Sequence, residues 1–226
     1  MRLMNSVVDL VIFDCDGTLV DSELLNNTAT SEALAAVGFP QYTPEYCMDT
    51  YVGWYQSKIW RVVEEEHDVK LPPDISRIYI ERVRALQPAL ARPAPGIEAV
   101  LGELQKNHPM CVASNGEPEN VRGLLEGTGL IRFFETDRIY TAALVPEPKP
   151  APDLFLYAAA QYGVDPERCL VAEDSLAGAK AGVAAGMTVF GYTGLAHQPA
   201  AQAARLRQAG AHKVSDRIAD LLTCFG

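Results

Sequence analysis

The sequence predicts an α/β fold: a doubly wound parallel sheet with a helical domain inserted after the first strand. A continuous apolar run at residues 10–13 is typical of a strand buried in a parallel sheet. From residue 97 onward, short apolar runs alternate with helical patterns, as they do in strand–helix–strand units. Residues 20 to 90 carry helical patterns with no convincing strand.

Three helices are expected after the first strand, and they form the inserted domain. They cover about 22–37, 54–66 and 74–90, and Gly38 ends the first of them. The segment ARPAPG at 91–96 is typical of a linker, because its prolines restrict the backbone. We therefore expect a core domain formed by residues 1–20 and 91–226 and an inserted domain formed by residues 21–90.

The rest of the core alternates between helices and strands. Helices are expected at 97–107, 118–127, 152–162, 177–185, 199–210 and 218–222. Strands are expected at 110–115, 138–142, 169–174, 187–192 and 212–215. Strands that alternate with helices in this way form a parallel sheet with helices on its faces.

The charge of the chain restricts its partners. The 226 residues carry a formal net charge of −10, which disfavours nucleic acid and anionic membranes as partners. An anionic substrate would therefore need local positive charge from a metal ion or a few lysines and arginines. We expect a small-molecule substrate and a monomer, with a dimer as the alternative.

The cysteines and the hydropathy pattern favour a cytoplasmic setting. The five cysteines are scattered and form no CxxC pair, so they are expected to be reduced core thiols. The chain shows no apolar signal segment, and no apolar run reaches the roughly 18 residues of a membrane span.

Polar side chains follow three of the predicted strands where each strand ends. They are Asp14 and Asp16 after the first strand, Ser114 and Asn115 after the second, and Glu173 and Asp174 after the fourth. Sites in open α/β sheets form at the carboxyl ends of the strands, so these side chains should meet. Four clustered carboxylates repel one another, and Mg²⁺, which prefers oxygen ligands, would relieve the repulsion.

Each of these features also has a purely structural explanation when taken alone. Asp14 and Asp16 could cap a turn, and the Ser114–Asn115 pair could form one. The two acidic residues after the fourth strand could belong to the N-cap region of the next helix. Lys149, between two prolines, could be an ordinary solvated lysine.

Taken together, four segments resemble the motifs of the haloacid dehalogenase superfamily in its phosphatase and phosphomutase form. They are DCDGTLVDSE, VASNG, KPAPDLF and AEDSLAGAKAGVAAGM, in that order along the chain. The resemblance implies a Rossmann-like core with a helical cap. The insertion is similar to the cap of the branch that contains β-phosphoglucomutase and many sugar-phosphate phosphatases. Segments such as MCVASNG look like those of bacterial phosphatases that act on 6-phosphogluconate.

The resemblance implies catalytic and metal-binding roles for the core residues. Asp14 would attack phosphorus to form an aspartyl-phosphate, and Asp16 would act as general acid and then general base. Ser114 and Lys149 would bind the transferring phosphoryl group. The Mg²⁺ ligands would be Asp14, Asp174, Glu173 and the carbonyl of Asp16. The phosphate- and substrate-binding residues would be Cys15, through its backbone N–H, with Gly17, Thr18, Asn115, Gly53, Gln56 and Lys58.

The implied function is a Mg²⁺-dependent phosphatase acting on a sugar or sugar acid phosphate. Two alternatives stay open: a phosphomutase of the β-phosphoglucomutase type, and a non-catalytic binding protein on the same fold. β-Phosphoglucomutase-like sequences carry an arginine shortly after the glycine of the cap segment, for the second phosphate. Here Gly53 is followed by Trp54, Tyr55 and Gln56, with Lys58 close behind. This departure disfavours the mutase and leaves hydrolysis untouched.

Overall fold

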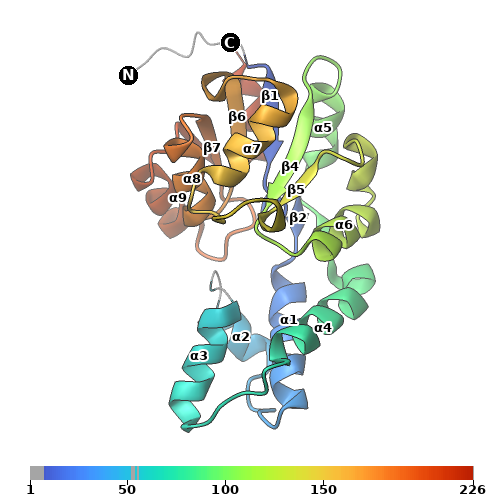
Figure 1. The fold of residues 1–226 in the computed structure, drawn as a ribbon, viewed down its shortest axis with the longest axis vertical. Helices are drawn as coiled ribbons and strands as arrows, with labels where there is room; N and C mark the ends of the chain where they lie inside the picture. The colour runs from blue at the N-terminus through green and yellow to red at the C-terminus, as the bar shows by residue number, and fades with distance from the viewer. Residues whose placement is uncertain (1–7, 52–53, 55, 226) are drawn as a thin grey trace. The chain divides into compact units, whose positions relative to one another are not determined.

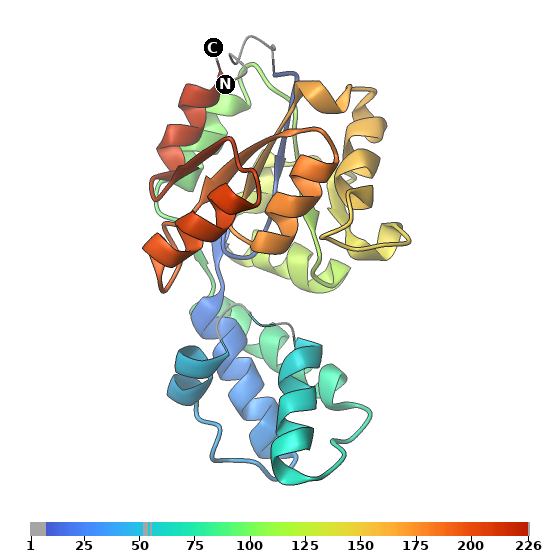
Figure 2. The same ribbon diagram turned by 90° about the vertical axis from the view of Figure 1, so that its left-hand side faces the viewer.

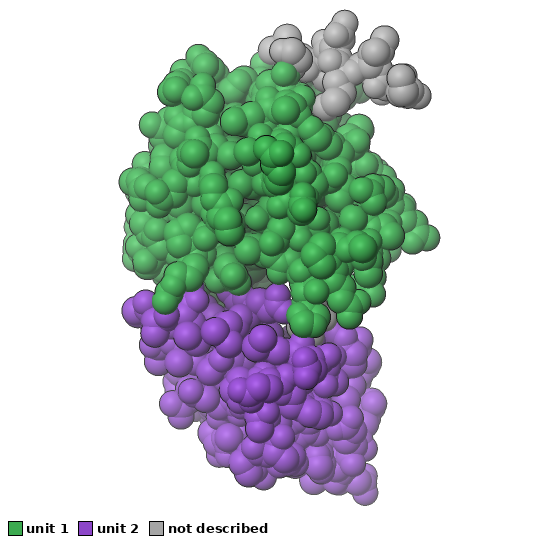
Figure 3. All heavy atoms as spheres, turned by 180° about the vertical axis from the view of Figure 1, so that it is seen from behind, with its two compact units in different colours: residues 1–21, 92–226 green, residues 22–91 purple. Residues whose placement is uncertain are grey.

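A computed structural model describes residues 8–51, 54 and 56–225 of the chain (Figure 1). The chain divides into two compact units, a core of Met1–Asp21 with Arg92–Gly226 and an inserted cap of Ser22–Ala91 (Figure 3). Both boundaries between the units lie one residue later along the chain than the sequence predicts.

The core is built on one six-stranded parallel sheet, with the strand order β5-β4-β1-β6-β7-β8. The strands are β1 (Leu10–Phe13), β4 (Met110–Ser114), β5 (Ile139–Thr141), β6 (Cys169–Glu173), β7 (Thr188–Tyr192) and β8 (Lys213–Ser215). The four residues of β1 are fully buried, because β1 lies between β4 and β6 and beneath helices on both faces. The central position of β1 brings its end next to the ends of β4 and β6.

Helices cover both faces of this sheet (Figures 1 and 2). They are α5 (Ile97–Leu104), α6 (Pro118–Gly127), α7 (Asp153–Tyr162), α8 (Leu176–Ala184) and α9 (Pro199–Gln208), with short 3₁₀ helices η1 (Leu130–Phe133), η2 (Ala142–Leu144), η3 (Pro166–Arg168) and η4 (Ile218–Cys224). Leu10 and Ile12 face the cluster formed with α7, α8 and α9. Phe13 points the other way and meets Phe134, with ring centroids 6.3 Å apart. The doubly wound α/β prediction is confirmed.

The cap is a separate helical unit with its own core. Its helices are α1 (Glu23–Ala36), α2 (Pro44–Thr50), α3 (Gln56–His67) and α4 (Ile75–Leu90). Trp60 is buried in the hydrophobic cluster to which all four of these helices contribute, and Trp54 packs against that cluster. No helix in the described part of the chain is long and apolar enough to cross a membrane.

Three local predictions were wrong. The last predicted helix, at 218–222, is the 3₁₀ helix η4. Part of the expected linker is the strand β3 (Arg92–Pro93), which pairs antiparallel with β2 (Val20–Asp21). The helix α2 was missed, although Thr43 caps it by accepting from Tyr46 N at 3.2 Å. Elements of two to seven residues are too short to show an apolar period, so only their partners or caps reveal them.

Candidate active site

The turn after β1 places Asp14 at the centre of the sheet edge. The Asp14 N–H donates to the Ala172 carbonyl at 3.0 Å, which ties the end of β1 to β6. The turn then closes through Gly17 N–H, which donates to the Val20 carbonyl at 2.9 Å. Gly17 has a φ of 79°, and a Cβ there would lie 2.3 Å from Asp174 Oδ2. Only glycine suits this position, because it accepts positive φ and leaves room for the carboxylate.

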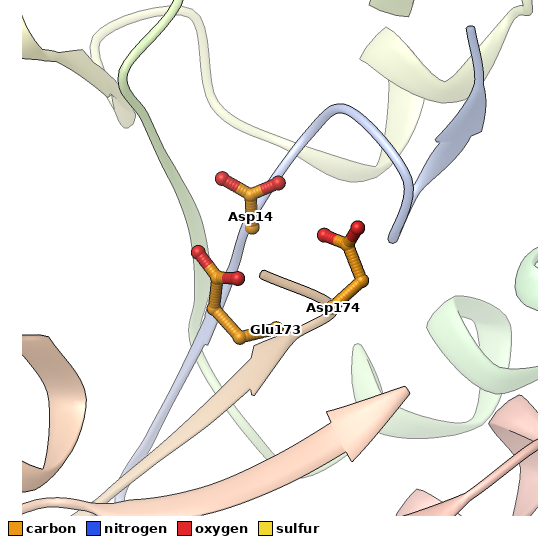
Figure 4. A group of neighbouring side chains, drawn as sticks. All are labelled: Asp14, Glu173 and Asp174. Carbon is orange, nitrogen blue, oxygen red and sulfur yellow. The ribbon is translucent and has the colours of Figure 1, made fainter. Parts of the chain in front are cut away.

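Three carboxylates meet beyond the ends of β1 and β6 (Figure 4). One oxygen from each of Asp14, Glu173 and Asp174 lies within 4.8 Å of the others. Burial raises the pKa of Asp14 to about 8, the Glu173 charge adds to this increase, and Lys149 opposes it. Burial and then the charges of Glu173 and Asp14 raise the pKa of Asp174 well above its usual value. A hard divalent cation fits this set of oxygen donors and would offset their repulsion.

Lys149 lies inside this cluster and is fully hydrogen-bonded. Its Nζ donates to Asp14 Oδ1 at 2.7 Å, to Glu173 Oε1 at 2.7 Å and to the Ala113 carbonyl at 2.8 Å. These three acceptors match the three donors of an ammonium group. Burial lowers the pKa of Lys149, but the charges of Asp14 and Glu173 outweigh burial and raise it, so the lysine stays charged. The interpretation of Lys149 as a solvated surface residue is therefore wrong.

Glu173 also connects the acidic cluster to the start of α8. Its Oε2 accepts from Ser175 N at 2.8 Å and from Ser175 Oγ at 2.9 Å. Ser175 is the N-cap of α8, since its Oγ accepts from Gly178 N at 2.9 Å. Taken alone, Glu173 and Asp174 could have belonged to the N-cap region of this helix. The N-cap itself is Ser175, and Glu173 accepts hydrogen bonds from it.

The fit between Glu173 and α8 leaves no room for a side chain at position 178. A Cβ on Gly178 would lie 1.6 Å from Glu173 Oε1, an oxygen that Lys149 holds in place. Gly178→Ala should therefore lower the free energy of unfolding by about 1–3 kcal/mol and reduce activity, despite the better helix propensity of alanine. Urea unfolding measures this change.

Gly102 provides the matched control within α5, because a Cβ there meets nothing within 4 Å. Gly102→Ala should stabilise the protein by about 0.5–1 kcal/mol. Equal stability changes at the two positions would contradict the packing described for Glu173.

The end of β4 supplies a hydroxyl and an amide. Ser114 is buried, and its Oγ accepts from Gly116 N at 3.0 Å. A Cβ on Gly116 would lie 3.3 Å from Ser114 Oγ and 3.7 Å from Asp16 Oδ2, so both side chains flank this glycine. Asn115 reaches across to the backbone of Lys149. The structure thus brings together the predicted residues of all three strand ends.

Two further side chains, those of Thr18 and Gln202, form hydrogen bonds with Asp174 at the carboxyl edge of the sheet, and the sequence predicted neither contact. Thr18 Oγ1 donates to Asp174 Oδ1 at 3.2 Å, so Thr18 contacts a carboxylate of the acidic cluster. Gln202 donates from Nε2 to the Asp174 carbonyl, and no sequence motif signals this contact. The Ser175–Gly178 spacing is an N-cap pattern that could have been noticed. Cys15 is buried, and burial raises the pKa of its thiol well above the usual value, so the thiol stays neutral.

The predicted cap residues lie in the other unit, where each described one has a partner. Gln56 Nε2 donates to Thr30 Oγ1 at 2.7 Å. Lys58 Nζ lies over the Trp54 ring, 3.3 Å from its centroid. Gly53 falls outside the described residues. Substrate binding by Gln56 and Lys58 stays a prediction.

Comparisons with known proteins agree with this geometry. The haloacid dehalogenase-like hydrolase family matches residues 8–186. The chain is 32% identical over 186 residues to 6-phosphogluconate phosphatase from Escherichia coli, covering 82% of both chains. It is 33% identical over 181 residues to the fructose-1-phosphate phosphatase of the same species, covering 78% of this chain and 92% of the relative. A conserved haloacid dehalogenase-like protein from Agrobacterium tumefaciens has a similar structure, with a TM-score of 0.79, 34% identity and 96% of both chains covered. The chain therefore belongs to the haloacid dehalogenase-like hydrolases and is a phosphoric monoester hydrolase.

Proposed function

We propose that the protein is a Mg²⁺-dependent phosphatase that hydrolyses a sugar or sugar acid phosphate through an aspartyl-phosphate. The observation that carries this proposal is the contact between Lys149 and Asp14 inside the acidic cluster. The two relatives named for 6-phosphogluconate and fructose 1-phosphate support the substrate class.

In this mechanism Asp14 is the nucleophile. Lys149 Nζ donates a hydrogen bond to Asp14 Oδ1, so we assign the attack on phosphorus to Asp14 Oδ2. The P–O bond to the substrate alcohol breaks as the bond to Asp14 forms. Asp16, two residues along the turn, gives its proton to the leaving oxygen. It then takes a proton from the water that attacks the phosphorus of the aspartyl-phosphate, and this attack releases phosphate and restores Asp14.

The other groups stabilise charge on the transferring phosphoryl group. We assign Ser114 Oγ and the Lys149 ammonium to its oxygens. Asp14, Glu173 and Asp174, with the carbonyl of Asp16, would hold Mg²⁺, which would offset the negative charge of the phosphate. Gly17 leaves the turn free of a side chain that would otherwise meet Asp174.

A phosphate-release screen tests the proposal and separates it from the mutase alternative. The screen contains 6-phosphogluconate, fructose 1-phosphate and other sugar and sugar acid phosphates, each with Mg²⁺. We expect free phosphate from at least one of them. β-Glucose 1-phosphate with a trace of the 1,6-bisphosphate should give little glucose 6-phosphate, because Gln56 stands where the arginine is expected, and a neutral amide holds a second phosphate weakly.

Two results of this screen would count against the proposal. Isomerisation is measured by coupling glucose 6-phosphate to glucose-6-phosphate dehydrogenase. An isomerisation rate above the rate of phosphate release would favour the mutase. Release from none of the esters would favour the binding-protein alternative.

Removal of the metal should abolish activity and change stability in a pH-dependent way. EDTA should stop turnover and Mg²⁺ should restore it, while Ca²⁺, which takes more ligands at longer distances, should inhibit. The raised pKa of Asp14, about 8, means that the metal-free protein loses stability as pH rises from about 4 towards 8. Since the metal needs ionised carboxylates, Mg²⁺ should raise Tm more at pH 8 than at pH 5.

Thermal unfolding with Mg²⁺ and with EDTA at several pH values measures this linkage. A Mg²⁺ effect on Tm that is equal or larger at pH 5 would contradict the metal assignment, as would full activity in EDTA. The cytoplasmic location and the monomeric state stay predictions, and size-exclusion chromatography tests the second.

A further inference from the structure

We propose that the side chain of Asn115 positions Lys149 and does not bind the substrate. This inference rests on the proposed function, in which Lys149 acts beside the nucleophile Asp14. It replaces, for the side chain, the sequence-based expectation that Asn115 is a phosphate- or substrate-binding residue.

The Asn115 side chain forms a reciprocal pair of hydrogen bonds with one residue. Its Nδ2 donates to the Lys149 carbonyl at 2.9 Å, and its Oδ1 accepts from the Lys149 N–H at 3.0 Å. A primary amide has one carbonyl oxygen and two N–H donors. The oxygen and one donor are therefore turned towards Lys149, and phosphate binding through this side chain could use a single remaining N–H.

The backbone of the loop that carries Lys149 forms few other hydrogen bonds, and one of them joins Leu156 N to the Pro152 carbonyl at 3.0 Å. Lys149 lies in the run Pro148–Pro152, whose three prolines have no N–H to donate. The run forms one internal backbone hydrogen bond, from Ala151 N to the Pro148 carbonyl at 2.9 Å. In the hydrogen bonds of the described residues, both backbone groups of Lys149 go to Asn115.

Residues at the end of β4 thus hold both the backbone and the side-chain ammonium group of Lys149. Asn115 binds its backbone, and the Ala113 carbonyl, two residues earlier, accepts from its Nζ at 2.8 Å. The same ammonium group lies 2.7 Å from Asp14 Oδ1. A shift of the Lys149 backbone would move the ammonium group relative to Asp14. The Asn115 amide therefore determines the position of the ammonium group through the backbone, without contacting it.

A double-mutant cycle with Lys149→Met tests this role, with p-nitrophenyl phosphate and the best ester of the screen as substrates. Asn115→Ala should lower kcat by about 10- to 100-fold, because misplacement by about 1 Å costs that much, and KM should change by less than about twofold. In the Lys149→Met background, Asn115→Ala should change kcat by less than about twofold, since the group that it positions is gone.

Tyr162→Phe is the matched control at the opposite end of β4. The Tyr162 hydroxyl donates to the Met110 carbonyl at 2.9 Å, so this variant also removes a bond from a side chain to the strand backbone. Its kcat should stay within about twofold of wild type. Asn115→Ser, which keeps a turn-forming residue, replaces Asn115→Ala if the alanine variant does not fold.

Three kinetic outcomes would overturn the inference. A raised KM with unchanged kcat would make Asn115 a substrate ligand. An equal loss of kcat with and without Lys149 would show that Asn115 acts independently of the lysine. A loss no larger than that of Tyr162→Phe would reduce the amide to a general structural contact.

Crystal structures separate a failure of this inference from a failure of the proposed function. If the wild type hydrolyses no ester, the proposed function fails, and the position of Lys149 can still be compared between the wild type and Asn115→Ala. The inference expects the Lys149 Nζ to lie beyond hydrogen-bond distance of Asp14 Oδ1 in the variant, against 2.7 Å in the wild type. An unchanged distance would overturn it.

Discussion

Replacing Asp14 with asparagine should leave the fold intact and lower phosphate-ester hydrolysis by at least about 10⁴-fold, because a covalent route ends when its nucleophile is removed. The amide has almost the shape of the carboxylate and keeps an acceptor for Lys149 Nζ. It also removes a carboxylate whose pKa burial raises to about 8, so the variant does not lose a favourable buried charge. Steady-state kinetics measure the loss of activity, and thermal unfolding measures the fold.

Asp9→Asn is the control at the other end of the same strand segment. Asp9 directly precedes β1 and pairs with Arg168, at the opposite end of the strand from the acidic cluster. This variant loses a carboxylate in the same way and should keep its activity. Borohydride reduction during turnover should trap the acyl phosphate at position 14 of the wild type, with mass spectrometry as the readout. An Asp14→Asn variant that keeps a tenth of wild-type activity would rule out the aspartyl-phosphate.

Replacing Lys149 with methionine should reduce both activity and stability. The substitution removes the cation that the buried side chains of Asp14 and Glu173 share. In the wild type, Lys149 Nζ lies 2.7 Å from an oxygen of each of them. Breaking a buried ion pair by removing one partner costs about 3–5 kcal/mol, and we expect a loss of that size in the free energy of unfolding at neutral pH. Activity should fall about 10³-fold, because the phosphoryl group loses a charged donor.

The stability loss should depend on the metal and on pH. Mg²⁺ supplies positive charge to the same carboxylates, so it should raise the Tm of Lys149→Met more than that of the wild type. Lower pH should also reduce the difference, since protonated carboxyls no longer repel one another. Urea unfolding with and without Mg²⁺ at two pH values separates these effects.

Lys106→Met is the control for the loss of a lysine charge. Lys106 Nζ lies 2.6 Å from Glu103 Oε2, a shorter contact than those of Lys149, but both side chains are more than half exposed. Exposed pairs contribute about 0–1 kcal/mol, so this variant should unfold almost like the wild type. Similar stability losses for the two lysines would contradict the view that burial makes the Lys149 contacts strong.

The sequence predicted the parts of the site that depend on neighbouring residues. The apolar run of β1 and the Asp14–Asp16 spacing lie within a few positions of each other, so their pattern is visible along the chain. The general rule for open α/β sheets then brings the strand ends together. A place for Lys149 in the site was expected only from the family resemblance, and its contact with Asp14, 135 positions away, came only from the structure.

The sequence by itself determined the fold class, the helical insertion and the set of polar residues at the strand ends. The tertiary structure alone decided which of these side chains bind one another: Thr18 with Asp174, 156 positions apart, and Asn115 with the backbone of Lys149, 34 positions apart. It also explains why glycine suits position 178, because the Glu173 side chain fills the space beside it. Such contacts follow from the strand order β4-β1-β6 and from close packing, and neither leaves a periodic pattern in the chain.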